Sequence, residues 1–132
     1  STASETASNE AIRIPKVNYE FNKANLDQQA QNAIDTTVLQ LLRNRPNAKV
    51  QIRSHTDNAG SDTYNMKLSQ RRAQRVVDYL VEQGIARKRL EAKGFGEQKP
   101  LAPNFNLDGT DNPKGRQKNR RTEFKVIGRM QR

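Results

Sequence analysis

The chain has 132 residues, enough for one domain built around a single hydrophobic core. Only 33% of the residues are hydrophobic and none is Trp, so the core must come mainly from Leu, Val and Ile. The absence of cysteine excludes disulfides and thiolate chemistry, and the single histidine argues against a histidine-based metal centre. No apolar run approaches the roughly 20 residues that a membrane span needs. The polar N-terminus lacks the apolar segment of a signal peptide, so we expect a mature fragment or a domain of a larger chain if the protein is exported.

The positive charge of the chain favours a polyanionic partner. Lys and Arg number 24 against 14 Asp and Glu, a formal net charge of +10. This charge is compatible with nucleic acid, anionic lipid or an acidic polymer. The excess is uneven, because residues 114–132 hold a single acid, Glu123, and the following basic residues: Lys114, Arg116, Lys118, Arg120, Arg121, Lys125, Arg129 and Arg132.

The first third of the chain predicts a linker, a strand and a helix. Residues 1–14 are small and polar without periodicity, so we expect a flexible linker before a domain spanning residues 15–132. Apolar and polar residues alternate over residues 17–21, which predicts a short strand. Apolar residues then recur at helical spacing from Leu26 to Leu42. This helix should end before Pro46, because a residue that precedes proline avoids the helical conformation.

The stretch from residue 50 to residue 81 predicts a strand, a polar turn and a long helix. Val50 and Ile52 alternate with polar residues, as in a strand with one buried face. Turn-forming residues follow, and Asp62 or Ser61 is a suitable helix N-cap. The buried stripe of the predicted helix consists of Tyr64, Leu68, Val76, Val77, Leu80 and Val81.

The last third predicts two further strands and a long loop. Residues 85–89 form a short connector, residues 90–96 a third strand and residues 122–127 a last strand. Residues 97–118 contain three prolines and two glycines, and a loop of this length is functional, mobile or both. The order βαβα(β)β predicts an α/β (α+β) two-layer sandwich, with the helices packed on one face of a mixed sheet.

Arg72 does not fit the apolar stripe on which it falls. It lies between Leu68 and Val76 in the helical repeat, so its side chain should run along the apolar edge. Asp57, at the carboxyl end of the preceding strand, lies near the same helix. The two residues either face one crevice suited to a ligand with both charges, or form a plain salt bridge. Residue types alone favour the salt bridge.

Enzymatic and metal-dependent functions find little support in the residues. His55, Asp57 and a nearby serine lack the nucleophile elbow and the oxyanion loop of a hydrolase. A glycosidase needs two placed carboxylates, and Asp57 has no clear acidic partner. Residues 104–109 resemble half of an EF-hand loop, but Gly115 stands where a bidentate Glu is required. We therefore expect no enzyme, no metal and no cofactor.

A nucleic-acid-binding domain is the alternative function. It would use a basic surface without a helix-turn-helix or an aromatic ladder, so a solvated basic face explains the same residues equally well. The surface would consist of Arg71, Arg72, Arg75, Arg87, Lys88 and Arg89.

Residues 55–80, HTDNAGSDTYNMKLSQRRAQRVVDYL, resemble the signature of the OmpA-like C-terminal peptidoglycan-binding domain. That family (OmpA, Pal and MotB types) occurs in outer-membrane porins, Pal-type lipoproteins and flagellar stator proteins. The flanking segments 21–26, 84–85, 94–100 and 119–124 are also similar, so the resemblance covers about residues 15–128.

The resemblance implies a binding mode as well as a fold. Family members bind the peptide stem of peptidoglycan without covalent bonding and grip its diaminopimelate residue. Asp57 would hold the ammonium end of that zwitterion and Arg72 its carboxylate. The remaining positions of the family's pocket fall on Asn22, Asn65, Arg120, Thr56 and Leu68. The two amides would offer hydrogen bonds, Arg120 a second cationic contact, and the last two residues would shape the wall.

The same resemblance implies a periplasmic module that ties an outer-membrane or envelope protein to the cell wall of a Gram-negative bacterium. Its expected partner is peptidoglycan, with other envelope proteins of a larger complex as further candidates and nucleic acid not among them. Pal-type members carry an N-terminal lipidated cysteine, which this chain lacks, so we expect any membrane anchor to lie outside this fragment. The loop 97–118 lacks the cysteine pair of some porin members.

Overall fold

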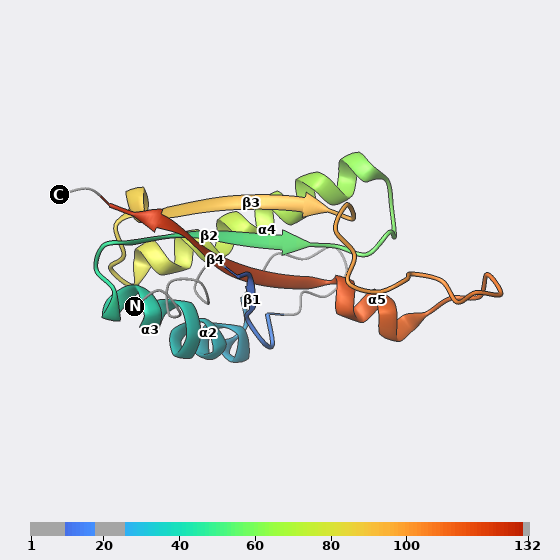
Figure 1. The fold of residues 1–132 in the computed structure, drawn as a ribbon, viewed down its shortest axis with the longest axis horizontal. Helices are drawn as coiled ribbons and strands as arrows, with labels where there is room; N and C mark the ends of the chain where they lie inside the picture. The colour runs from blue at the N-terminus through green and yellow to red at the C-terminus, as the bar shows by residue number, and fades with distance from the viewer. Residues whose placement is uncertain (1–9, 18–25, 131–132) are drawn as a thin grey trace.

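Four strands form one open mixed sheet in the computed structural model, which describes residues 10–17 and 26–130 (Figure 1). The strands are β1 (Ile12–Arg13), β2 (Ala48–His55), β3 (Leu90–Gly96) and β4 (Arg121–Arg129). Their order across the sheet is β1-β4-β2-β3. The central strand β2 runs parallel to β3 and antiparallel to β4. The predicted mixed sheet is therefore confirmed.

The first helical stretch consists of three consecutive segments, α2 (Gln28–Ile34), a π-helical turn η1 (Asp35–Leu39) and α3 (Gln40–Asn44). The side chain of Asp27 caps its start by accepting a hydrogen bond from the backbone N–H of Ala30 at 2.8 Å. Within the wide η1 turn, Thr37 Oγ1 donates to the carbonyl of Ala33 at 2.6 Å. The predicted helix over residues 26–42 is confirmed, but its apolar spacing did not reveal the π turn.

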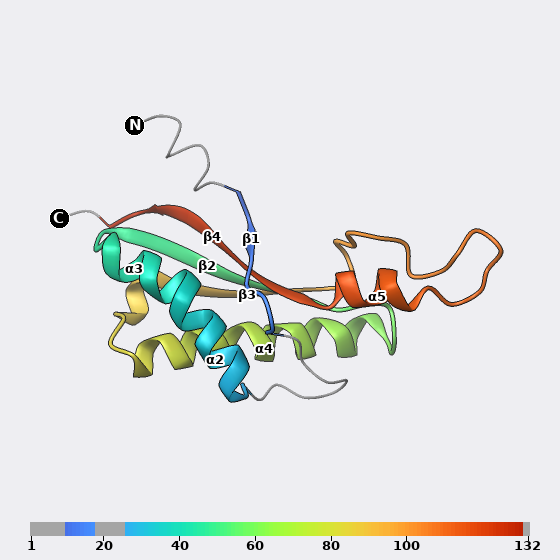
Figure 2. The same cartoon turned by 90° about the horizontal axis from the view of Figure 1, so that it is seen from below.

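The long helix α4 (Asp62–Glu82) follows β2 and returns along the sheet. Ser61 is its N-cap, with Oγ accepting from the N–H of Tyr64 at 3.1 Å. Figure 2 shows α2, α3 and α4 on one side of the sheet, as predicted. Two short helices complete the described elements, η2 (Arg87–Arg89) and α5 (Pro113–Asn119). Within residues 10–17 and 26–130, none of the helices combines the length and apolarity needed to cross a bilayer.

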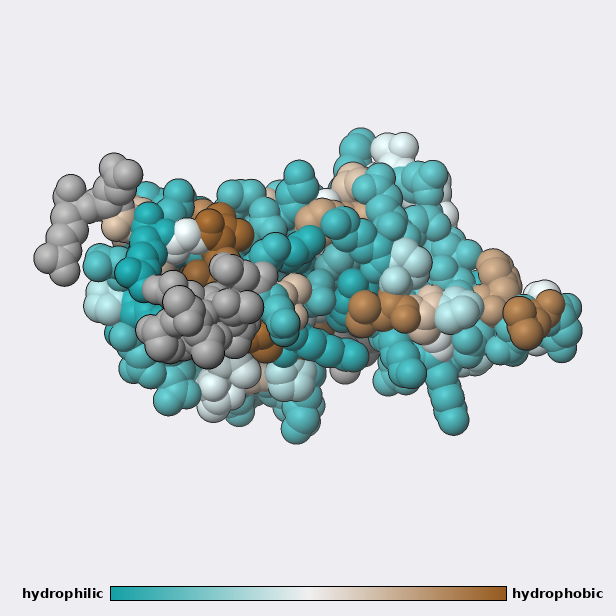
Figure 3. Space-filling view, viewed as in Figure 1, coloured by the Kyte–Doolittle hydropathy of each residue, from teal (hydrophilic) through white to brown (hydrophobic). Residues whose placement is uncertain are grey.

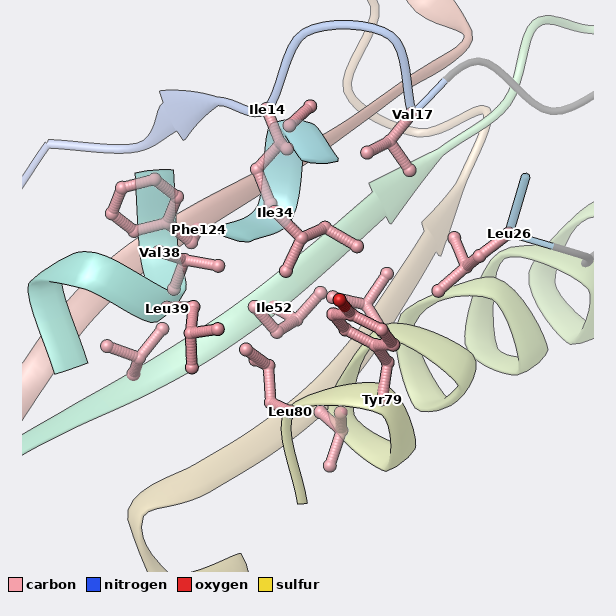
Figure 4. Packing of buried hydrophobic residues seen from close by; sticks show 14 of the residues in the cluster. Ile14, Val17, Leu26, Ile34, Val38, Leu39, Ile52, Tyr79, Leu80 and Phe124 are labelled. Atoms are coloured by element: carbon pink, nitrogen blue, oxygen red, sulfur yellow. The ribbon is translucent and has the colours of Figure 1, made fainter. Parts of the chain in front are cut away.

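The hydrophobic core lies between the sheet and this helical layer. Val50 and Ile52 of β2 are fully buried against the helices, and Phe124 of β4 joins them (Figure 4). Tyr79 of α4 links the two helical stretches, because its hydroxyl donates to Asp35 Oδ1 at 2.6 Å. Burial together with this bond raises the pKa of Tyr79 to about 12.

Helix α4 approaches β3 more closely than a side chain would allow. A Cβ at Gly94 would lie 2.3 Å from the backbone nitrogen of Gln70. The Gln70 amide itself bridges the strand, donating to the carbonyl of Ala92 at 3.1 Å and accepting from the N–H of Gly94 at 2.8 Å. Ser69 Oγ accepts from the N–H of Gly96 at 2.9 Å. These contacts fix the position of α4 over the carboxyl end of the sheet.

The structure differs from the sequence prediction at two boundaries. The linker predicted for residues 1–14 extends too far, because Ile12–Arg13 pairs with β4 and Ile14 is buried. The loop predicted over residues 97–118 contains most of α5, which Asn112 caps by accepting from the N–H of Gly115. The strand predicted for residues 17–21 falls almost entirely outside the described residues.

Candidate functional site

Asp57 lies in the turn that joins the carboxyl end of β2 to the N-terminus of α4. It is only 6% exposed. Its Oδ1 accepts from the backbone N–H of Ala59 at 2.9 Å, which fixes the side chain over the turn. Its Oδ2 lies 2.5 Å from Nη1 of Arg120, the C-cap residue that follows α5. The carboxylate is therefore ionically paired and held in one orientation.

The buried face of α4 contributes the next residues. Asn65 is 1% exposed, and its Nδ2 donates to the backbone carbonyl of Asp57 at 3.3 Å. Leu68 and Arg72 follow at one-turn intervals, which places Arg72 about 10 Å further along the same face. Arg72 is 2% exposed, so it lies on the buried face of α4, where the sequence predicts that its side chain runs along the apolar edge. A buried carboxylate and a buried guanidinium thus belong to two consecutive elements.

The predicted site residues are distributed as follows. The structure brings Thr56, Asp57, Asn65 and Arg120 together, with Leu68 and Arg72 beyond them on α4. The hydroxyl of Thr56 donates to the carbonyl of Asp57 at 2.8 Å, so this residue supports the turn. Asn22 lies outside the described residues.

Glu97 belongs to this region but was not among the predicted site residues. It follows the last residue of β3, beside the first turn of α4. The pKa of Glu97 is raised, mainly by a hydrogen bond with Asp62 and to a lesser degree by burial. A hydrogen bond with Asn65 partly opposes this shift. Its sequence signal was its place directly after the Gly94-Phe95-Gly96 strand end.

Arg116 of α5 ties the long loop to the turn that carries Asp57. Its Nη1 donates to Asn58 Oδ1 at 2.6 Å, its Nε pairs with Asp111, and its guanidinium lies 5.0 Å from the Phe105 ring centroid. The buried Asn119 holds the start of the loop, because its Oδ1 accepts from the N–H of Leu101 at 2.7 Å. No sequence pattern indicates these contacts, since they join segments with no fixed spacing.

On the other face of the sheet, His55 forms a buried pair with Glu123. Its Nε2 lies 2.6 Å from Glu123 Oε1, and its ring stacks on Phe95 with centroids 5.1 Å apart. Burial lowers the pKa of His55, although Glu123 opposes the shift. Burial alone would raise the pKa of Glu123, but His55 and Arg121 outweigh it and lower the pKa. The histidine therefore packs inside the sheet between Glu123 and Phe95, where burial favours its neutral form.

The basic surface of the nucleic-acid alternative is not continuous. Arg72 is buried, and Arg89 Nη2 donates to the carbonyls of Leu42 at 2.8 Å and Arg45 at 2.6 Å. Two of the six predicted residues are thus used inside the fold. Among the described residues, no group of three or more His, Asp or Glu side chains is arranged to hold a metal ion.

Comparison with solved structures agrees with this fold. The chain superposes on the peptidoglycan-associated lipoprotein from Burkholderia pseudomallei with a TM-score of 0.70, at 25% identity over 83% of this chain and 87% of that one. It superposes on the cell wall anchor of the T6SS from Pseudomonas aeruginosa with a TM-score of 0.69. That match has 29% identity and covers 89% of this chain and 79% of that one.

Comparison of sequences gives relatives that are longer than this chain. It is 44% identical to Outer membrane protein A of Escherichia fergusonii over 65% of its length and 36% of that protein. The chain is also 44% identical to Photosystem I P700 chlorophyll a apoprotein A2 of Gloeobacter violaceus, over 82% of this chain but only 12% of that protein. The family model described as "OmpA family" matches residues 18–120. The chain belongs to the OmpA family.

Proposed function

We propose that this domain binds peptidoglycan without covalent bonding, through the diaminopimelate residue of its peptide stem. Support comes from the family and from a solved relative named as a peptidoglycan-associated lipoprotein. One observation carries the proposal. A buried carboxylate, Asp57, and a buried guanidinium, Arg72, are presented by β2's exit turn and by α4.

Asp57 receives the ammonium group of the ligand. Its carboxylate is fixed by the N–H of Ala59 and is only 6% exposed, so an incoming cation meets an oriented acceptor in a site with little competing water. The Arg120 guanidinium at 2.5 Å holds this carboxylate in the free protein and shares it with the ligand.

Arg72 receives the carboxylate of the same ligand end. A guanidinium binds a carboxylate through two parallel N–H donors, which fixes both distance and direction. Because Asp57 and Arg72 carry opposite charges, the pair selects a zwitterion over a ligand with only one of the two groups.

The remaining pocket residues orient the stem. Asn65 supplies an amide next to Asp57, and Arg120 supplies a second cation at the rim, with a side chain that is 36% exposed. Thr56 and Leu68 form the wall, and Asn22 is proposed to add a second amide. None of these roles involves bond making, so the domain acts as a binding module rather than an enzyme.

We place the domain in the periplasm, where it links a parent protein of the outer membrane to the cell wall. Two relatives support this location, an outer membrane protein and a cell wall anchor. Other envelope proteins of the same assembly are proposed as additional partners.

Calorimetric titration tests the proposal with two muropeptides that differ in one group. A diaminopimelate-containing muropeptide should bind, and its lysine-containing counterpart should bind about 10- to 100-fold more weakly, because lysine leaves Arg72 without its carboxylate. Equal binding of both muropeptides would reject the zwitterion clamp.

Two conservative variants test the proposed zwitterion clamp, which consists of Asp57 and Arg72. Asp57→Asn keeps the turn hydrogen bond but removes the charge, and Arg72→Met keeps the buried volume but removes the donors. Arg72→Met should lose the preference for diaminopimelate, whereas Asp57→Asn should weaken binding of both muropeptides, because both carry the ammonium group. Thermal unfolding should show that each variant remains folded. Exposed Lys67→Gln is the matched control and should bind like the parent. Parent-like binding by both clamp variants would place the pocket elsewhere.

A further inference from the structure

A row of charged residues crosses the face of the sheet that none of the described helices covers. Strand register aligns Arg13 of β1 with Glu123 of β4, Glu123 with Arg53 of β2, and Arg53 with Lys93 of β3. Directly paired residues point to the same face, and β2 alternates so that Arg53 lies opposite the buried Ile52 and Ser54. Three of the four residues in this row are cationic.

Further cations gather around Phe95 on the same face. The Arg53 guanidinium lies 4.5 Å from the ring centroid, Lys99 Nζ 4.8 Å and Lys93 Nζ 5.9 Å. The ring attracts these cations and offsets part of their mutual repulsion. The arrangement concentrates positive charge where an anion can reach it, because Lys93 and Lys99 are exposed.

A hollow at the edge of this face is lined by basic side chains from β1 and α5. Arg13, Lys114, Gln117 and Lys118 surround a volume of about 340 Å³. The three cations and one amide supply donors suited to a carboxylate or another small anionic group. Figure 3 shows the same side of the molecule, on which hydrophilic residues surround a few hydrophobic patches.

We infer that this open face binds carboxylates of the peptidoglycan polymer at a second place, separate from Asp57 and Arg72. The inference rests on the proposed function, because only a polymer bound at the first site brings its neighbouring stems to the second. A contact on the same polymer gains effective concentration, so weak ionic contacts there strengthen attachment to intact wall. Soluble stem fragments do not reach both places.

The character of the face favours carboxylates over the bases of a single-stranded nucleic acid. Stacking of bases needs exposed aromatic rings. Phe95 is half-buried, with the His55 ring stacked on it and Arg53 also over it. The remaining recognition groups are charges and one amide.

The test removes three exposed lysines from the face without touching the proposed clamp. We compare the 132-residue chain with the variant Lys93→Gln/Lys114→Gln/Lys118→Gln in two assays. These are pull-down with purified diaminopimelate-type sacculi and calorimetry with the soluble diaminopimelate muropeptide. The matched control, Lys67→Gln/Arg87→Gln/Lys88→Gln, removes three exposed charges from α4 and η2.

In 50 mM salt, the face variant should need about tenfold more sacculi for half-maximal binding, whereas the control should change less than twofold. The difference should shrink in 500 mM salt, because exposed charges are then screened. Muropeptide binding should be the same in all three proteins. If the parent itself does not bind the muropeptide in calorimetry, the proposed function fails. The sacculus pull-down tests only the second binding place, so the two failures are distinguishable.

Three results would overturn the inference. The first is that the face variant binds sacculi like the parent. The second is that the control loses as much sacculus binding as the face variant. The third is that the face variant also loses binding of the soluble muropeptide. A competition arm separates the partner classes. If a single-stranded oligonucleotide releases the parent from sacculi at concentrations where polyglutamate of equal charge does not, the face binds a phosphate polymer instead.

Discussion

His55 and Glu123 form a pair whose protonation is linked to folding. In the folded chain, burial disfavours the charged imidazole and lowers the pKa of His55 from its ordinary value of 6.5. The pKa of Glu123 is also lowered in the folded chain, against the effect of its own burial, because it accepts from His55 and lies beside Arg121. Acidification therefore acts on both groups in the same direction.

We predict that the domain loses stability as the pH falls from 7.5 to 5.5. Near and below pH 6.5 the unfolded chain binds a proton at His55 more readily than the folded chain does, because the pKa of His55 is lower in the folded chain. The free energy of unfolding therefore decreases with falling pH. The slope from one such proton is at most about 1.4 kcal/mol per pH unit. The contribution of Glu123 lies lower and is lost only as the pH falls below its unfolded pKa of 4.5.

Urea unfolding at pH 7.5, 6.5 and 5.5 measures this slope. The variant His55→Gln keeps a donor near Glu123 without a titrating ring, and its slope over this interval should be flatter. A parent chain with constant stability over the interval, or a variant with the same slope, would contradict the assignment to His55.

Individual residues of the site were predictable from sequence where one element determines them. Arg72 follows from the helical repeat of α4, whereas Asn65 was indicated only by the resemblance to the family's pocket. Asp57 follows from the end of a strand. Arg116 was not predictable, because it meets Asn58 only when a loop of no regular spacing folds back. Nor did the residues predict that Asp57 pairs with Arg120, which is 63 positions away.

At the level of elements, the contact between α4 and β3 determines where Arg72 lies relative to Asp57. The helix backbone rests on Gly94, and the Gln70 amide bridges two backbone groups of β3. A residue with a Cβ at position 94 must push α4 away from the strand, since the backbone N and Cα of Gln70 would lie only 2.3 and 2.7 Å from that Cβ.

We therefore predict that Gly94→Ala lowers the free energy of unfolding by about 3 kcal/mol, near the upper end for overpacked sites. Gly128→Ala is the control, because a Cβ there meets nothing within 4 Å, and its effect should stay within about 0.5 kcal/mol. Urea midpoints measure both variants. Equal midpoints would show that α4 adjusts freely and does not position the clamp.

The elements themselves followed from periodicity, and the exceptions have physical causes. The η1 turn (Asp35–Leu39) leaves the apolar repeat of the sequence unchanged. The hydroxyl bond from Thr37 to the carbonyl of Ala33 in α2 has no counterpart in that repeat. Helix α5 has no apolar stripe. Its cap at Asn112 and the buried Asn119 define it, and polar residues between prolines resemble a loop.

For the whole molecule, ligand binding and folding are coupled by mass action. A diaminopimelate muropeptide at 100 times its dissociation constant should stabilise the folded chain by about 2.7 kcal/mol. For a domain of this size, that corresponds to a rise in Tm of roughly 8 °C. Thermal scans with and without the muropeptide measure the rise, and Asp57→Asn should abolish it. A rise of the same size in Asp57→Asn would show that binding does not involve this carboxylate.

The outer side of β3 has a consequence for association between molecules. An edge strand normally offers unpaired backbone N–H and C=O groups to which a strand from another chain can pair, and such pairing leads to edge-to-edge aggregation. Here the side chain of Gln70 imitates a neighbouring strand by taking the carbonyl of Ala92 and the N–H of Gly94. If many copies of the domain are bound to the cell wall at high local density, the occupied edge of β3 therefore disfavours strand pairing between neighbouring copies.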